Sequence, residues 1–179
     1  MVPTSTYNSD GYSGFEEVTI ADWSSFLSVQ AEAAATLTGL IFVAMSINAE
    51  RVMTFPGLPS RAGEAVLQFL QVFFVASVML APDLPGRTRP VEVLVIAIVS
   101  WGAQIIGQLR YLRVRAGHPW SWFIWRAVLA QLATIPFCIA GGLLLAGNAY
   151  ALEWLMPGFL FSFAAGLLSA WVLLVEIRR

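Results

Sequence analysis

The stretch that decides the fold is residues 152–177, which reads LEWLMPGFLFSFAAGLLSAWVLLVEI. No charged residue lies between Glu153 and Glu176. A helix needs roughly 20 mostly apolar residues to cross the hydrocarbon core of a bilayer, so this stretch predicts a membrane-spanning helix. Pro157 lies early in it, and a helix that begins only at Pro157 is the main alternative. The chain would then have four spans and a re-entrant segment.

Four further apolar stretches precede it, each bounded by proline, glycine or a capping residue. Asp22 is expected to cap the first helix, and Gly147 is expected to end the fourth as a C′ glycine. The predicted helices run over about residues 23–47, 61–81, 90–113, 122–147 and 152–177. The sequence therefore predicts an all-α integral membrane bundle of about five transmembrane helices, residues 22–179. A loosely ordered extracytoplasmic tail, residues 1–21, is expected to precede it.

Composition supports this prediction, because 58% of the 179 residues are hydrophobic and only 12% are charged. A soluble domain carries about 25% charged residues, so lipid is expected to cover part of this apolar surface. The net charge of −1 offers no electrostatic basis for binding nucleic acid.

All basic residues are arginines, and their distribution predicts how the chain is oriented, because cytoplasmic loops carry an excess of basic residues. With five spans, only Arg87 and Arg89 lie on the side that holds the N-terminus. The opposite side holds Arg51, Arg61, Arg110, Arg113, Arg115, Arg126, Arg178 and Arg179. We therefore expect the N-terminus outside and the C-terminus in the cytoplasm, in a bacterial cytoplasmic (inner) membrane. All copies should insert the same way, so a homo-oligomer is expected to have parallel subunits.

A layer of polar side chains is predicted in the cytoplasmic half of the bundle. Its members are spaced by three or four residues, so those of one helix share a face. They are Glu64, Gln68 and Gln71 on the second predicted helix, Ser100, Gln104 and Gln108 on the third, and Gln131 on the fourth. The layer has two interpretations: hydrogen bonds that hold neighbouring helices together, or the lining of a hydrophilic pathway.

The outer half of the first predicted helix holds Glu32, followed by Thr36 one turn later. An ionisable residue inside a span is a functional candidate, because burying it in hydrocarbon is costly. One interpretation is a ring of Glu32 carboxylates around an oligomer axis, which would attract cations. The other is a glutamate that is protonated, paired with the outer loop, or placed at the membrane interface. Small-residue pairs, Ala35 with Gly39 and Ala103 with Gly107, indicate faces for helix association.

A basic and aromatic cluster is predicted at one cytoplasmic corner, and it follows from the positive-inside rule and an aromatic belt. It is also a candidate site for a lipid head group. Its arginines are Arg110, Arg113, Arg115 and Arg126, and its tryptophans are Trp120, Trp122 and Trp125.

No catalytic pattern is recognisable in the sequence. His118 is the only histidine and Cys138 the only cysteine, and neither belongs to a metal-binding or nucleophile motif. We therefore expect no catalytic or metal site, no cofactor and no enzymatic activity.

One part of the chain resembles a known group of proteins. Residues 38–51, TGLIFVAMSINAER, and residues 56–65, PGLPSRAGEA, are similar to uncharacterised small multi-pass membrane proteins of high-GC bacteria. Some of those proteins are labelled as modulators of a membrane protease. The resemblance implies a regulatory role and assigns no site residue.

The function that these patterns favour is a homo-oligomeric channel or pore for a small ion. One copy has few helices with which to enclose a pathway, so the pore is expected to need a ring of subunits. Cation preference would follow from Glu32 and from the expected lack of arginine inside the membrane. The alternatives are a non-conducting protein that binds and regulates another membrane protein, and a protein that binds lipid or a small solute.

Overall fold

The computed structural model describes the chain except for residues 1–12, 55–57, 83–86, 115–119, 149 and 179. The described part is all-α. Its helices are α1 (Ser13–Ile47), α2 (Ala49–Thr54), α3 (Leu58–Leu80), α4 (Thr88–Val114), α5 (Trp120–Leu145) and α6 (Ala151–Arg178). Five of them, all except α2, are long and apolar enough to cross a membrane. The chain is thus built as a multi-pass bundle with lipid as its expected surroundings.

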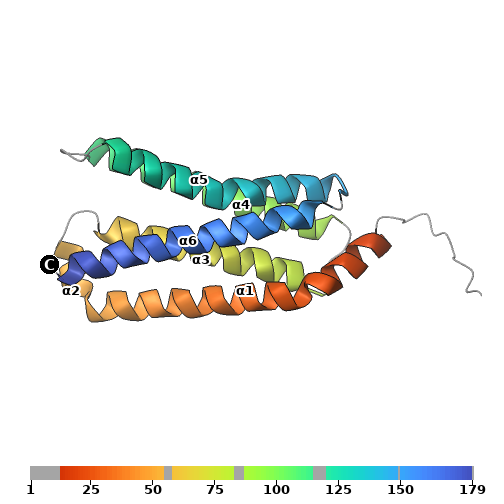
Figure 1. Ribbon diagram of the computed structural model, residues 1–179, viewed down its shortest axis with the longest axis horizontal. Helices are drawn as coiled ribbons and strands as arrows, with labels where there is room; N and C mark the ends of the chain where they lie inside the picture. The colour runs from red at the N-terminus through yellow and green to blue at the C-terminus, as the bar shows by residue number, and fades with distance from the viewer. Residues whose placement is uncertain (1–12, 55–57, 83–86, 115–119, 149, 179) are drawn as a thin grey trace, which may run out of the picture.

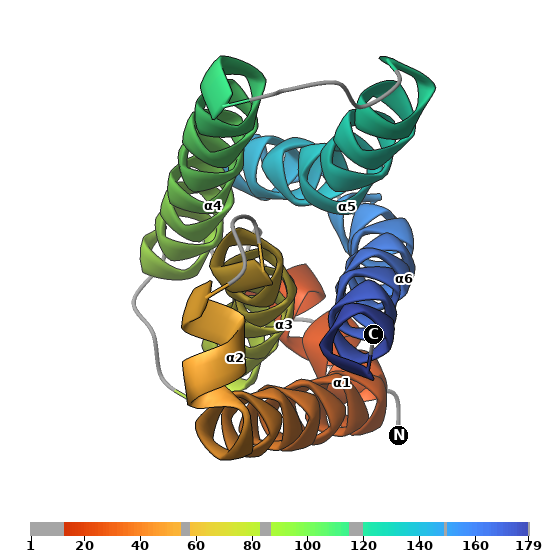
Figure 2. The same cartoon turned by 90° about the vertical axis from the view of Figure 1, so that its left-hand side faces the viewer.

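The helices form an elongated bundle whose axes run roughly along one direction (Figure 1). Viewed from one end, α3, α4, α5 and α6 follow one another around a ring, and α1 lies outside the ring against α3 (Figure 2). Helix α3 packs against α1, α4 and α6, and α5 packs against α4 and α6. We call the end of the bundle that holds α2 the α2 end. There α1, α4 and α6 end, and α3 and α5 begin.

Helix α1 begins earlier than the sequence indicated. It starts at Ser13, so Asp22 lies inside the helix and the predicted N-cap at Asp22 was wrong. Residues 13–21, which we expected in a loosely ordered tail, are helical, and residues 1–12 lie outside the described part. Adding residues to an existing helix is far easier than starting a new one, so a short polar stretch without proline can extend it.

The other helix ends follow local signals. Pro59 stands in the first turn of α3, where a missing N–H costs nothing. The predicted C′ glycine is confirmed. Gly147 has a φ of 68°, and the N–H of Asn148 donates to the carbonyl of Leu143, as in a Schellman cap. Helix α6 runs unbroken through Pro157, which favours five spans over four and a re-entrant segment. The short helix α2 was not predicted.

The bundle core is packed from aromatic rings against glycines. Phe69, Phe137 and Phe159 are fully buried, and the rings of Phe137 and Phe159 meet edge to face with centroids 5.2 Å apart. A Cβ atom added at Gly158 would lie 2.9 Å from the ring of Phe137. One added at Gly166 would lie 2.5 Å from the ring of Phe69. Since lipid is as apolar as these side chains, close contact of this kind stabilises a membrane bundle more than burial itself does.

The small-residue pairs named from the sequence have no role inside one subunit. Ala35 and Ala103 are exposed, and a Cβ atom added at Gly39 or Gly107 would meet nothing within 4 Å. These faces point outward and are left for lipid or another protein. The close approach of α4 and α5 occurs instead at Gly141, where an added Cβ would lie 2.9 Å from the Cα of Leu94.

Candidate functional site

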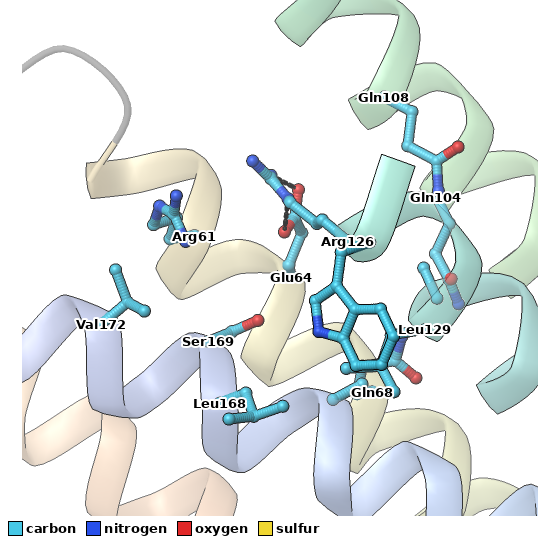
Figure 3. A pocket seen from close by; sticks show the side chains of 13 residues that line it. Arg61, Glu64, Gln68, Gln104, Gln108, Arg126, Leu129, Leu168, Ser169 and Val172 are labelled. Atoms are coloured by element: carbon cyan, nitrogen blue, oxygen red, sulfur yellow. Dashed lines mark hydrogen bonds and ion pairs between the residues drawn. The ribbon is translucent and has the colours of Figure 1, made fainter. Parts of the chain in front are cut away.

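A pocket of about 380 Å³ lies between α3, α4, α5 and α6, towards the α2 end (Figure 3). Its polar lining residues are Arg61, Glu64, Gln68, Gln104, Gln108, Arg126 and Ser169. The rest of the wall is largely apolar, including Leu129, Leu168 and Val172. A pocket of this volume, with apolar walls and a few polar groups, is typical of a binding site for a small molecule.

Helix geometry arranges these polar residues in layers along the pocket. With a rise of 1.5 Å per residue, Glu64, Gln108 and Arg126 each lie about 9 Å from the helix end at the α2 end. Gln68 and Gln104 lie about 15 Å from it. Gln68 and Gln104, which the sequence predicted at a similar depth, both line the pocket. All five belong to helix segments that are apolar enough to cross a membrane.

An ion pair joins α3 to α5 in the layer nearest the α2 end (Figure 3). The Nε of Arg126 donates to one carboxylate oxygen of Glu64 at 2.8 Å, and its Nη2 donates to the other. The side chain of Arg126 is 17% exposed and that of Glu64 22%, so the pair is largely withdrawn from the surface. A two-pronged contact of this kind holds the charges in a fixed geometry and cancels them.

A hydrogen-bonded cluster closes the deep end of the pocket. The amide nitrogen of Gln104 donates to the hydroxyl oxygen of Thr134 and to the amide oxygen of Gln71. Gln71 in turn donates to the carbonyl of Ala133 at 3.4 Å, and Ser162 donates to the same carbonyl at 3.1 Å. Pro136 follows one turn later in α5 and has no N–H to donate to the carbonyl of Leu132, which loosens the backbone bonding of this turn.

Not every buried polar atom at the pocket has a partner. Within the part of the chain that the structure describes, no hydrogen bond is made by the Oε1 atoms of Gln68 and Gln104 or by the Nε2 atom of Gln108. Gln68 is 4% exposed and Gln104 5% exposed. A buried amide group without a partner costs roughly 1–3 kcal/mol, so these three atoms favour a bound polar group in the pocket.

No family model, curated protein or solved structure matches this chain. Across the described part of the chain, no three histidine, cysteine, aspartate or glutamate side chains converge. Apart from Arg61 and the ion pair of Glu64 with Arg126, the polar groups that line the pocket are amides and a hydroxyl, which suit hydrogen bonding to an uncharged polar group.

Two of the candidates from the sequence lie away from the pocket. Glu32 and Thr36 are exposed on α1, and the hydroxyl of Thr36 donates to the backbone carbonyl of Glu32. Only 17% of the residues in the apolar window of α1 are buried. Glu32 and the glutamines therefore do not line a common path within one subunit.

The predicted polar layer is divided by the structure. Gln68, Gln104 and Gln108 line the pocket, Gln71 closes its deep end, and Ser100 is buried one turn beyond Gln104. The side chain of Gln131 turns elsewhere, and its Oε1 accepts a hydrogen bond of 2.7 Å from the indole of Trp101. The pocket is a polar space inside a single bundle, and the expectation that a continuous pathway needs a ring of subunits stays a prediction.

The predicted arginine cluster is also divided. Arg126 lines the pocket and pairs with Glu64, whereas Arg110 is exposed on α4. The side chain of Arg113 and all of Arg115 lie outside the described part. Arg126 lies three residues after Phe123, where the helix segment of α5 that can span a membrane begins.

Sequence reasoning missed two participants, Thr134 and Ser162, which are both fully buried. Threonine and serine are common in membrane helices and often bond to their own backbone, so neither residue carried a signal of its own. For Thr134, its position 30 residues after Gln104 becomes informative only once α4 and α5 are known to pack side by side.

Proposed function

We propose that this chain is a membrane protein that binds a small amphipathic molecule in the pocket between α3, α4, α5 and α6. The observation that carries the proposal is the set of buried, unpartnered amide atoms in a largely apolar pocket of about 380 Å³. An amphipathic ligand would pair with the amides and place its apolar part against Leu129, Leu168 and Val172.

The shape of the pocket supports binding over conduction. Beyond Gln71 and Thr134 the bundle is filled by buried apolar side chains such as Val75, Ala76 and Ala140. A ligand that enters from the α2 end therefore meets a closed floor, which suits a binding site and opposes a continuous path through one subunit.

The rim of the pocket indicates how a ligand would enter. Trp125 and Leu168 line the pocket and are nevertheless 68% and 49% exposed, so they also belong to the outer surface of α5 and α6. In a bilayer this surface faces lipid, and an amphipathic molecule would reach the pocket from the membrane.

We also propose the orientation that the arginines favour, with the α2 end and the C-terminus in the cytoplasm of a bacterium. The pocket would then open towards the inner leaflet of the cytoplasmic membrane. A protease-sensitive tag after Arg179 should be cleaved only in inside-out vesicles, and cleavage in intact spheroplasts would reverse the orientation.

Filling the pocket provides the test of binding. Native mass spectrometry of the purified protein is expected to show a retained small amphiphile that Ala130→Trp loses by about tenfold or more, because the indole occupies the space of the ligand. Ala103→Trp, on the exposed face of α4, is the matched control and should retain the ligand. Equal retention by both variants would place the ligand outside the pocket and contradict the proposal.

A second candidate function, the homo-oligomeric channel for a small cation, is favoured by the position of Glu32. The residue lies ten positions after Asp22, about 15 Å into the span, and it is exposed there. An acidic side chain that faces lipid at such depth costs about 3 kcal/mol, and a ring of parallel subunits would remove it from lipid.

The channel candidate predicts that liposomes with the native protein conduct cations and that Glu32→Gln reduces the preference for cations over anions. Glu153→Gln, which changes an exposed glutamate in the first turn of α6, is the control. A monomer by native mass spectrometry would remove the channel and leave the alternative, a partner protein that covers Glu32.

A further inference from the structure

We infer that the polar part of the ligand is uncharged and donates hydrogen bonds, as the hydroxyl groups of a glycerol-headed or sugar-headed lipid do. The inference rests on the proposed function and names the class of molecule that the pocket takes. It assigns the recognition to Gln68, Gln104 and Gln108, whose buried polar atoms have no partner in the described part of the chain.

The three glutamines offer two acceptors and one donor to a ligand. The Oε1 atoms of Gln68 and Gln104 are acceptors, so the ligand has to supply a donor to each. The Nε2 atom of Gln108 is a donor and needs an acceptor. Because a hydroxyl group both donates and accepts, two hydroxyls satisfy all three atoms, whereas a ligand with only carbonyl or ether oxygens leaves both acceptors unsatisfied.

The three glutamines are spaced along the pocket by about one helical turn. Gln68 and Gln104 lie at a similar depth on the neighbouring helices α3 and α4, and Gln108 lies four residues, about 6 Å, nearer the α2 end. Figure 3 shows Gln104 and Gln108 following one another along one side of the pocket, with Gln68 below them. Hydroxyls on neighbouring carbon atoms lie about 3–4 Å apart, and each reaches a hydrogen-bond partner about 3 Å away, so a compact polyol can bridge amides one turn apart where a single hydroxyl cannot.

The charged side chains of the pocket lie nearer the α2 end than Gln68 and Gln104 do. Glu64 and Arg126 lie one turn above Gln68, and each already has the other as its counter-charge. A charged group placed among the glutamines would enter a region of low dielectric constant without a dedicated partner. Arg61, the other arginine of the lining, lies seven residues before Gln68 in α3, about 10 Å nearer the α2 end, so the pocket favours an uncharged head group among the glutamines.

The test uses the full-length protein and three probes with the same ten-carbon chain. They are the monoacylglycerol, its analogue with both hydroxyls methylated, and the free fatty acid. Affinities come from native mass spectrometry titrations. The monoacylglycerol is expected to bind about tenfold or more tightly than the methylated analogue, which corresponds to about one lost hydrogen bond in a buried site. It should also bind more tightly than the fatty acid.

A variant assigns the preference to the glutamines. Gln68→Leu is expected to bring the affinity ratio of the monoacylglycerol to its methylated analogue towards one. The control Gln131→Leu, whose amide bonds with Trp101 outside the pocket, should leave the ratio unchanged. The affinity ratio is measured separately for each protein. If a variant does not fold, the ratio of the native protein still tests whether the ligand's hydroxyls are recognised.

The outcomes separate the two levels of the proposal. If no probe binds and no amphiphile is retained from the membrane, the proposed function itself is wrong. If the monoacylglycerol and the methylated analogue bind equally, the pocket binds amphiphiles but water satisfies the amides, and the inference is overturned. Tighter binding of the fatty acid would assign the head-group recognition to the arginines and would also overturn it.

Discussion

Replacing Arg126 with glutamine is expected to lower the free energy of unfolding by about 3 kcal/mol. The substitution leaves the carboxylate of Glu64 inside an apolar helix segment without the guanidinium that now contacts both of its oxygens. Breaking a buried ion pair from one side costs more than the pair contributes, because the remaining charge is left without compensation. The expected loss lies at the lower end of the range typical of buried ion pairs that lose one partner, because both side chains keep some exposure.

Two further variants distinguish this cause from a general loss of packing. Arg110→Gln removes an exposed arginine from α4 and is expected to change the free energy of unfolding by less than about 0.5 kcal/mol. The double variant Glu64→Gln with Arg126→Gln should recover much of the loss, because no unpaired charge remains. Reversible unfolding in mixed detergent micelles measures all three. A double variant as unstable as Arg126→Gln would refute the charge argument.

Gly141→Ala is expected to destabilise the bundle by about 2 kcal/mol, although it adds only one methyl group. The new Cβ would lie 2.9 Å from the Cα and 3.0 Å from the backbone N of Leu94. Backbone atoms cannot rotate away as a side chain can, so α4 and α5 have to separate where they meet at Gly141.

The neighbouring glycine is the matched control for this prediction. A Cβ added at Gly142 meets nothing within 4 Å, and Gly142 lies inside α5. Gly142→Ala is therefore expected to raise the free energy of unfolding by about 0.5–1 kcal/mol, because alanine loses less conformational freedom in a helix than glycine does. Adjacent substitutions of opposite sign are the expected result. The same sign for both would show that α4 and α5 are not in close contact at Gly141.

The candidate site illustrates how far local patterns extend. The spacing of Gln68 and Gln71, and of Gln104 and Gln108, identified helix faces correctly, and a constant rise per residue predicted that Gln68 and Gln104 share a depth. The same reasoning placed Gln131 in this layer. Its depth is close to that of Gln68 and Gln104, but its side chain points to Trp101 and not into the pocket. A depth follows from counting residues, whereas the direction of a side chain around its helix has a meaning only relative to a neighbour.

The ion pair between Glu64 and Arg126 shows what such reasoning leaves out. Both residues were noted, one as a member of the polar layer and the other as part of a cytoplasmic arginine cluster. They lie 62 positions apart, and nothing in either local pattern refers to the other. Only the packing of α3, α4, α5 and α6 around one space brings them together.

The sequence by itself determined the all-α class, the five apolar helices and most of their ends, because length, hydropathy and capping act within a few turns of one chain segment. The tertiary structure decided which faces of those helices meet. It turned the glutamines of α3 and α4 towards a space inside one subunit and left Glu32 on the outer face of α1. In lipid, both inward and outward faces are apolar, so hydrophobicity cannot select the inner face, and close packing at positions such as Gly141 and Gly166 makes the selection.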